Sequence, residues 1–258
     1  MECEKLLEII GKTEYRCGEL MLSAGNVCGE QKSGRRDVVT EYDSRIQKIL
    51  VDELGGAVPG AHFFCEERGN RDSLGAEHVF VIDPIDGTMN FVHGFNYSCI
   101  AVAYLNRGKP AVSAVYNPYA DEMFSAIAGK GAYLNGKRLG HVPEEPLENC
   151  IICCGTSPYY PEKYDETFSI MRKCMEYGLD IRRQGTAELD FCSVAAGRAG
   201  LFFEQLLSFW DFAAGMLIAG EAGALCLAMD GNGLPLDGRK SSVLCGNSRA
   251  VEDFLKIL

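Results

Sequence analysis

The stretch VFVIDPIDGTMNF, Val79–Phe91, decides how this chain is organised. Its first four residues, Val79–Ile82, are apolar and mostly β-branched, and they predict a buried strand. The strand ends at Asp83, a second carboxylate follows at Asp86, and the small pair Gly87-Thr88 lets backbone amides approach an anion closely. Two carboxylates beside such a turn indicate a site where a divalent cation bridges protein oxygens and a phosphate. Taken alone, the same residues also fit an ordinary turn.

The composition is that of a soluble globular protein. The chain has 258 residues, 47% hydrophobic and 24% charged, enough for one large domain or two closely packed halves. Its formal net charge of −11 argues against a general basic surface for nucleic acid, and a phosphate substrate would need metal ions to offset repulsion. No apolar run approaches the roughly 20 residues of a membrane span, and the first residues do not resemble a signal peptide. We therefore expect neither a nucleic-acid partner nor a membrane.

The twelve cysteines raise the question of disulfides or a metal site. Most of them lie inside apolar runs and resemble small core residues. The segment CIICC, Cys150–Cys154, has no second CxxC and no nearby histidine pair, which argues against zinc. Reduced thiols in a cytoplasmic protein are the better interpretation.

A helix and a basic segment open the chain. Apolar residues at helical spacing predict an amphipathic helix over residues 2–28. The polar stretch Glu30–Asp37 follows, and its composition is typical of a mobile loop. It contains a basic cluster, Lys32, Arg35 and Arg36. The cluster is either a solvated surface or a lid whose cation meets a substrate or an attacking water.

Acidic residues then follow two strand-like segments. Thr40 and Asp43 stand at the N-cap and third positions of a predicted helix, a variant of the capping box, which is a sufficient structural reason for both. Glu66 and Glu67 close the short predicted strand Phe63–Cys65. Adjacent glutamates repel each other unless they are exposed or bound to a metal, so Glu66 is either a surface residue or a metal ligand.

The middle of the chain predicts a meander of antiparallel strands, without the alternation of strands and helices that gives a parallel sheet. Asn135-Gly136-Lys137 is a hairpin-turn signal within it. The segment HVPEEPLEN, His141–Asn149, has two prolines and clustered acids and is the best internal boundary. The predicted strands are Ser98–Leu105, Ala111–Tyr116, Met123–Ala128 and Ala132–Leu134.

The second half mixes helices with short strands. A strand at Ile151–Cys154 and helices over residues 162–177 and Ala187–Ala199 are predicted, followed by a strand that ends at Glu204. A small-residue helix is predicted from Phe209 to Gly223. Asp211 would lie in its first turn, where a carboxylate suits the helix dipole, and a metal role is the alternative.

Each carboxylate has a modest explanation alone, but together they form a set: Glu66, Asp83, Asp86 and Asp211. Mg²⁺ uses few carboxylates per ion and keeps waters for a substrate phosphate. Four carboxylates suffice for two or three such ions, the arrangement for in-line displacement at phosphorus. No histidine, cysteine or serine occurs in a context typical of a nucleophilic triad.

These motifs resemble those of the inositol monophosphatase family of Mg²⁺-dependent, lithium-sensitive phosphatases. DPIDGTMNF (Asp83–Phe91) and WDFAAG (Trp210–Gly215) match its two signatures, and FFCEE and DVVTEYD resemble two shorter elements in the family order. The resemblance covers essentially the whole chain. It implies an α+β fold, a layered αβαβα sandwich, with an N-terminal α+β subdomain over residues 1–140 and a C-terminal α/β subdomain over 141–258. Departures are Cys65 in place of the usual glycine and Met89 in place of threonine or arginine.

The resemblance implies the metal ligands. Glu66, Asp83 and the backbone carbonyl of Ile85 would bind a first Mg²⁺, and Asp83, Asp86 and Asp211 a second. Glu66 would also help to hold a weaker third ion.

The resemblance also implies the residues around the substrate. Thr88 and Asp43, hydrogen-bonded to each other, would orient and activate the attacking water, and Glu66 completes the predicted catalytic set. The amides of Gly87 and Thr88 would hold the phosphate. The remaining predicted substrate contacts are Gly185, Thr186, Ala187, Glu204 and the loop residue Lys32.

The expected activity is in-line hydrolysis of a small phosphate monoester, with myo-inositol 1-phosphate preferred. Glu204 favours a neutral polyol as the alcohol part of the substrate, because its carboxylate would repel a second phosphate. The basic cluster at Lys32 mildly favours a substrate with a second phosphate. The alternatives are fructose 1,6-bisphosphate, histidinol phosphate or a 3′-phosphoadenosine nucleotide as substrate, or a regulatory binding protein on this fold. Lithium inhibition and a homodimer are expectations from the family resemblance.

Overall fold

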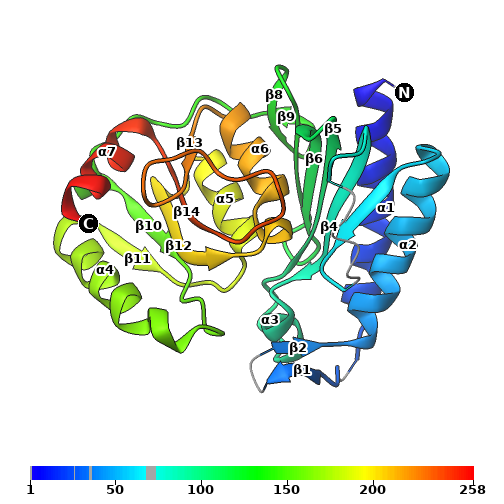
Figure 1. Ribbon diagram of the computed structural model, residues 1–258, viewed down its shortest axis with the longest axis horizontal. Helices are drawn as coiled ribbons and strands as arrows, with labels where there is room; N and C mark the ends of the chain where they lie inside the picture. Colours follow the sequence, from blue (N-terminus) through cyan, green and yellow to red (C-terminus); the bar gives the residue numbers. More distant parts are fainter. Residues whose placement is uncertain (1, 26, 35–36, 68–73) are drawn as a thin grey trace.

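The computed structural model describes residues 2–25, 27–34, 37–67 and 74–258. Five layers follow one another across the molecule (Figure 1). Helices α1 (Cys3–Leu22) and α2 (Glu41–Ala57) cover the outer face of one sheet, and α5 (Ala187–Ala195) and α6 (Ala213–Glu221) lie between the two large sheets. Helices α4 (Tyr164–Tyr177) and α7 (Ser248–Ile257) cover the outer face of the second sheet. The predicted αβαβα sandwich is therefore confirmed.

The first large sheet contains most of the stretch Val79–Phe91, on strand β4. Its strands lie in chain order, and every neighbouring pair is antiparallel except the parallel pair β3–β4. The predicted meander is thus confirmed. The strands are β3 (His62–Cys65), β4 (His78–Asp86), β5 (Cys99–Asn106), β6 (Lys109–Asn117), β7 (Glu122–Ile127), β8 (Gly131–Leu134) and β9 (Lys137–Arg138).

The second large sheet is mixed, in the order β11-β10-β12-β14-β13. Strand β10 runs parallel to both of its neighbours, whereas β14 runs antiparallel to β12 and β13. The strands are β10 (Ile151–Cys154), β11 (Asp180–Arg182), β12 (Leu201–Leu207), β13 (Leu225–Leu227) and β14 (Ser241–Gly246).

Alternate side chains of each sheet serve different cores, because successive residues of a strand point to opposite faces. On β4, Phe80 and Ile82 pack toward α1 and α2, whereas Val79 and Val81 belong to the central core. The central core also holds many alanines of α5 and α6, and such small side chains let helices lie close between two sheets. A third core joins α4 and α7 to the outer face of the second sheet.

The two large sheets fall on either side of the predicted boundary at residue 140. Strands β3–β9 end at Arg138 and strand β10 begins at Ile151. One central core nevertheless contains residues of both sheets, such as Val115 and Phe202. The division into subdomains 1–140 and 141–258 stays a prediction.

Several element boundaries differ from the sequence prediction. Helix α1 ends at Leu22 and not near residue 28. The expected loop Glu30–Asp37 contributes two strands of a hairpin, β1 (Glu30–Gly34) and β2 (Asp37–Val39), while Arg35 and Arg36 lie outside the described residues. Helix α5 ends at Ala195, before Gly197 adopts the left-handed conformation (φ 68°) that commonly closes helices.

Short elements complete the described part of the chain: α3 (Thr88–Val92) and the 3₁₀ helices η1 (Leu147–Asn149), η2 (Pro161–Lys163) and η3 (Phe209–Asp211). None of the helices in the described ranges has the length and hydropathy needed to cross a bilayer.

Candidate active site

A cavity of about 280 Å³ opens at the C-terminal end of β4 and is lined from both halves of the chain. All predicted metal ligands line it, and so do most predicted substrate contacts. From the N-terminal half come Glu66, Asp83, Ile85, Asp86, Gly87, Thr88, Met89 and Asn90. From the C-terminal half come Gly155, Pro158, Tyr159, Arg183, Gly185, Thr186, Ala187, Asp190, Glu204, Leu207 and Asp211.

An irregularity at the end of β4 turns two carboxylates into this cavity. The pairing of β4 with β5 shifts between Asp83 and Asp86, where proline removes a backbone donor. Asp83 Oδ1 accepts a hydrogen bond from the Ile85 amide at 3.1 Å. Asp86 Oδ2 accepts from the amide of Glu188 at 2.8 Å, so α5 holds it from the other half of the chain.

Asp211 reaches the same cavity by a route that the sequence analysis did not foresee. The predicted helix from Phe209 is broken: Asp211 ends the 3₁₀ helix η3, and α6 begins at Ala213. Asp211 Oδ2 accepts from the Ser208 amide at 2.7 Å in a capping box. The expected first-turn cap at Asp211 is therefore present, but it caps η3, and the continuous helix predicted from Phe209 is wrong.

The first turn of α6 is capped instead by Glu188 of α5. Its Oε1 accepts from the Ala214 amide at 3.2 Å and its Oε2 from the Gly215 amide at 2.5 Å. Glu188 is fully buried, and its own amide donates to Asp86. Glu188 thus ties the start of α6, two residues beyond Asp211, to the end of β4, through its carboxylate at one end and its backbone amide at the other.

Glycine is required at the turn that follows Asp86. Gly87 has a φ of 86°, a left-handed conformation that non-glycine residues rarely adopt. A Cβ atom there would lie 2.7 Å from Cγ2 of Thr186. The backbone of Gly87-Thr88 therefore lies tightly against Thr186, so the predicted phosphate-contacting turn and the predicted alcohol-contacting turn are neighbours.

Asp43 performs two tasks with two oxygens. Its Oδ2 accepts from the amide and hydroxyl of Thr40, at 2.7 and 2.6 Å, which is the predicted capping box of α2. Its Oδ1 accepts from the Thr88 hydroxyl at 3.2 Å, and that hydroxyl also lies 3.0 Å from the Ile85 carbonyl oxygen. The cap and the contact with Thr88, which the sequence left as alternatives for Asp43, are both present.

The carboxylates of the cavity raise one another's pKa. Burial, followed by the charges of Glu66, Asp86 and Asp211, raises the pKa of Asp83 well above its ordinary value. Burial is also the main cause that raises the pKa of Asp86 to about 7, although the Glu188 amide opposes it. Burial and the charges of Glu66 and Asp86 raise the pKa of Asp211. The metal-free cavity therefore holds more negative charge than its surroundings can stabilise.

This donor set fits a hard, hydrated divalent cation. Within the described residues, no group of three or more His, Cys, Asp or Glu side chains is close enough to hold a metal by itself. Mg²⁺ does not require such a group, because it binds through one or two carboxylates and keeps several waters. Four oxygen-bearing side chains around one cavity, with pKa values raised by mutual repulsion, are the environment that such a cation relieves.

The substrate side of the cavity is built around Glu204 of β12. This carboxylate is buried, and its Oε1 accepts from the amide and hydroxyl of Ser157, at 2.9 and 3.3 Å. A Cβ on Gly155 would lie 1.8 Å from Glu204 Oε2, so only glycine fits there. Burial raises the pKa of Glu204, and the Ser157 amide and the Arg183 charge oppose that rise.

Asp43 and Lys32 differ from the other predicted residues, and two buried acids, Glu188 and Asp190, were not predicted. Asp43 does not line the cavity, but it accepts a hydrogen bond from Thr88, which does. Lys32 lies in β1, but its side chain is outside what the structure describes. Glu188 and Asp190 are buried on α5, and Asp190 lines the cavity. The sequence offered one signal for them: both acids stand in a predicted helix whose other residues are small or apolar. Such a helix is buried, and an acid buried with it usually has a partner or a function.

Comparison with known proteins places the chain in a family. The model of the inositol monophosphatase family matches residues 4–257. The chain belongs to the inositol monophosphatase family. The family is metal-dependent, in agreement with the donor set described above.

The relatives that are similar in sequence bear two different names, Nus factor SuhB and inositol-1-monophosphatase. The "Putative Nus factor SuhB" of Neisseria meningitidis serogroup B is 34% identical over 250 residues, 96% of this chain and 95% of that protein. The "Inositol-1-monophosphatase" of Mesorhizobium japonicum is 35% identical over 255 residues, 97% and 95% of the two chains.

Solved structures share the fold. The extragenic suppressor protein suhB from Bartonella henselae has a TM-score of 0.90 at 30% identity, covering 98% of both chains. A staphylococcal inositol monophosphatase-1, described as an inhibitory complex soaked in 100 mM LiCl, has a TM-score of 0.88 at 26% identity, covering 100% of this chain and 96% of that one.

Proposed function

We propose that this inositol monophosphatase family member is a Mg²⁺-dependent phosphatase of small phosphate monoesters, with myo-inositol 1-phosphate as its preferred substrate. One observation carries the proposal: carboxylates from β4, from the end of β3 and from η3 line a single cavity beside the Gly87-Thr88 turn. Hydrolysis of a phosphate monoester requires positive charge to bind the phosphate and an activated water to attack it. Metal cations beside an anion-accepting turn supply both.

The proposed ligands are those implied by the family pattern. Glu66, Asp83 and the Ile85 carbonyl would hold one Mg²⁺, with Glu66 near a third. Asp83, Asp86 and Asp211 would draw together around a second, since these described side chains are not grouped closely enough to hold an ion by themselves. When bound, the cations neutralise the phosphate, activate water and stabilise the leaving alkoxide. The hydrogen bonds from the amides of Ile85, Glu188 and Ser208 pre-orient the three aspartates for this task.

Thr88 and Asp43 are the proposed route for the proton of the attacking water. The Thr88 hydroxyl donates to Asp43, which leaves its oxygen lone pairs able to accept a hydrogen bond from water. Thr40 fixes Asp43 through the other oxygen, so the pair is rigid before substrate arrives. This arrangement positions water on the side of the phosphate next to Gly87-Thr88.

Another part of the lining is the proposed binding surface for the leaving alcohol. Gly185, Thr186 and Ala187 lie at the start of α5, and Glu204 of β12 lines the same cavity. A buried carboxylate is suited to accept hydrogen bonds from sugar or polyol hydroxyls and disfavours a second phosphate. Arg183 also lines the cavity and would partly offset that repulsion, so bisphosphates remain the alternative substrate class.

A panel of phosphate esters, assayed with and without Mg²⁺, tests the proposal. We expect phosphate release only with Mg²⁺ and fastest turnover of myo-inositol 1-phosphate, and no turnover by Asp83→Asn at unchanged folding. Lys48→Met on α2, an exposed charge change outside the cavity, is the matched control. Faster turnover of fructose 1,6-bisphosphate or a 3′-phosphoadenosine nucleotide would overturn the substrate assignment, and turnover independent of metal would overturn the chemistry.

A regulatory role is a second candidate because one group of relatives bears the name Nus factor. Such a role would operate through protein contacts and not through a general nucleic-acid surface, since the chain is strongly acidic. An Asp211→Asn variant that folds separates the two functions. Loss of the cellular phenotype in that variant would favour the enzyme, and full retention would favour the regulator.

The assembly and compartment are also proposals. A homodimer follows from the family resemblance, and sedimentation equilibrium tests it. All twelve cysteines are free thiols, which agrees with the proposed cytoplasmic location.

A further inference from the structure

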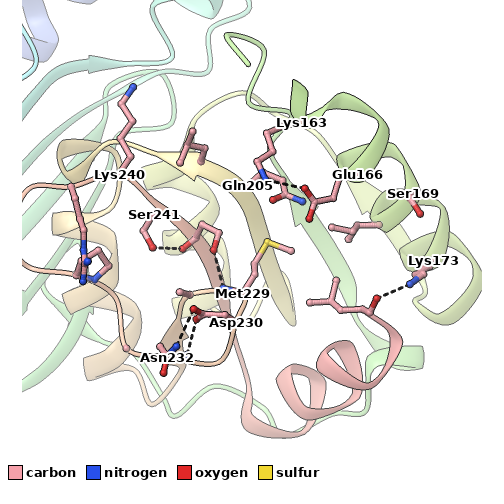
Figure 2. Close-up of a pocket in the computed structure, with 18 residues that line it drawn as sticks. Lys163, Glu166, Ser169, Lys173, Gln205, Met229, Asp230, Asn232, Lys240 and Ser241 are labelled. Atoms are coloured by element: carbon pink, nitrogen blue, oxygen red, sulfur yellow. Dashed lines mark hydrogen bonds and ion pairs between the residues drawn. The ribbon is translucent and has the colours of Figure 1, made fainter. Parts of the chain in front are cut away.

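Glu188 of α5 is a fully buried acid whose side chain has no role in the proposed function. Its two carboxylate oxygens accept hydrogen bonds from the amides of Ala214 and Gly215, at 3.2 and 2.5 Å. Many other acids pair with cations, as Glu166 does with Lys163 at 3.0 Å in the cavity beside α4 (Figure 2). None of the ion pairs in the described part of the chain involves Glu188. Burying an acid costs free energy that hydrogen bonds must offset, so the two amide contacts hold Glu188 in this position.

The two amides belong to the first turn of α6, whose own N-cap side chain cannot accept a hydrogen bond. Helices begin with amides that lack partners within the helix, and a polar N-cap side chain usually accepts from them. The N-cap of α6 is Phe212, whose side chain has no acceptor. Glu188 takes over this role from the neighbouring helix. The fit is close, because a Cβ atom on Gly215 would lie 2.6 Å from Glu188 Oε2 and 2.5 Å from Cβ of Phe191.

Glu188 also connects the segments that carry two of the proposed metal ligands. Its backbone amide donates to Asp86 Oδ2 at 2.8 Å, at the end of β4. Its carboxylate holds the start of α6, and Phe212 joins α6 to η3. The Phe212 amide donates to the Phe209 carbonyl at 3.4 Å, and its carbonyl accepts from an amide of α6. Asp211 lies in η3, directly before Phe212, so the separation of Asp86 and Asp211 depends in part on Glu188.

This link bears on metal binding because the described carboxylates of the cavity are not grouped closely enough to hold an ion by themselves. A cation shared by Asp86 and Asp211 must therefore draw η3 and the end of β4 together. A tether that limits how far η3 can move from β4 lowers the free energy needed for that step. Groups that orient metal ligands from outside the coordination sphere change metal affinity by about 10- to 100-fold when they are replaced.

We infer that Glu188 is a positioning residue for the second proposed Mg²⁺: its carboxylate keeps α6 and η3, and with them Asp211, within reach of Asp86. The inference rests on the proposed function, because it assigns Glu188 to the metal site proposed there. Glu188 does not line the cavity, so it acts through the two aspartates and not on the metal or the substrate. Its replacement should therefore weaken metal binding more than it changes the chemical step.

Calorimetric titration of Mg²⁺ into the full chain, without substrate, tests this role. We expect Glu188→Gln to weaken Mg²⁺ binding about tenfold and Glu188→Ala to weaken it more, because glutamine presents an NH₂ group to one of the two amides and alanine presents no acceptor. Glu221→Gln is the matched control, since Glu221 at the other end of α6 also accepts from two amides, those of Gly129 and Gly131, both at 2.7 Å. Glu221 lies outside the cavity lining, so this control should leave the Mg²⁺ affinity unchanged.

Two further measurements separate positioning from a general loss of stability. In an Asp211→Asn background, Glu188→Gln should cause no further loss of Mg²⁺ affinity, because the ligand that it positions is already removed. In steady-state assays, Glu188→Gln should need about tenfold more Mg²⁺ for half-maximal activity, with kcat close to that of the wild type at saturation. Unchanged Mg²⁺ affinity in Glu188→Gln, or equal weakening by Glu221→Gln, would overturn the inference, whereas a wild type that binds no Mg²⁺ would overturn the proposed function. If Glu188→Ala does not fold, the glutamine variant alone decides.

Discussion

Replacing Asp86 with asparagine should stabilise the metal-free protein while it abolishes catalysis. Burial raises the pKa of Asp86 from 3.8 to about 7 in the folded state. A folded-state pKa above the unfolded value means that folding favours the protonated carboxyl. Its stabilising contribution is complete below pH 3.8 and is lost as the pH rises through 7. Asparagine keeps an oxygen to accept from the Glu188 amide and carries no charge.

The size of the effect follows from the same shift. A pKa shift of about three units corresponds to a destabilisation of the folded metal-free wild type by roughly 4 kcal/mol at pH 8. This figure is an upper bound, because neighbouring carboxylates titrate together. At pH 5.5 most of the folded wild type is protonated, and the advantage of asparagine falls to roughly 2 kcal/mol. The stabilisation by Asp86→Asn should therefore grow with pH in the absence of metal.

Urea unfolding at pH 5.5 and pH 8, with a chelator, measures this difference. Saturating Mg²⁺ should reverse the order at pH 8, because the folded wild type binds the second cation through Asp86 and the variant loses that ligand charge. Asp52→Asn, on an exposed turn of α2, is the control for a carboxylate that is already solvated. A variant that is destabilised at pH 8 without metal, or a pH-independent difference, would refute the reasoning.

Three further predictions concern the same site. Thr88→Val, which removes the hydroxyl that contacts Asp43, should lower kcat by about 10²–10⁴ at unchanged thermal stability; a loss under tenfold in steady-state assays would exclude the proposed proton route. Thr40→Ala should cost about 1 kcal/mol in urea unfolding through the lost helix cap and should also lower kcat, and full activity would show that Asp43 needs no such support. Lithium chloride at 100 mM, the concentration reported for the staphylococcal relative, should inhibit turnover, whereas full activity would count against the resemblance in the metal site.

The fold was predictable where signals were local and strong. The meander of β5–β8 and the cap at Thr40–Asp43 follow from turn residues and capping patterns, and both are confirmed. The layer order came from the resemblance, because no local pattern says which helix lies between two sheets. Two helix ends were missed: α1 stops at Leu22, and α5 stops before Gly197, whose left-handed conformation closes it.

The sequence predicted which residues line the site but not the hydrogen bonds that place them there. Signature motifs indicated Glu66, Asp83, Asp86 and Asp211, and one cavity collects them. The break between η3 and α6 was not visible, because WDFAAG reads as continuous helix and the cap that interrupts it, Glu188, lies more than 20 residues away. Long-range hydrogen bonds of this kind have no sequence pattern within either segment.

Anomalous diffraction from crystals soaked in Mn²⁺, a redox-stable probe for Mg²⁺ sites, tests the central claim most directly. The account predicts at least one strong peak in the catalytic cavity, within bonding distance of Asp83 and of Asp86 or Asp211, and its loss in Asp83→Asn. A cavity without an anomalous peak at saturating Mn²⁺, in crystals of an active protein, would contradict it.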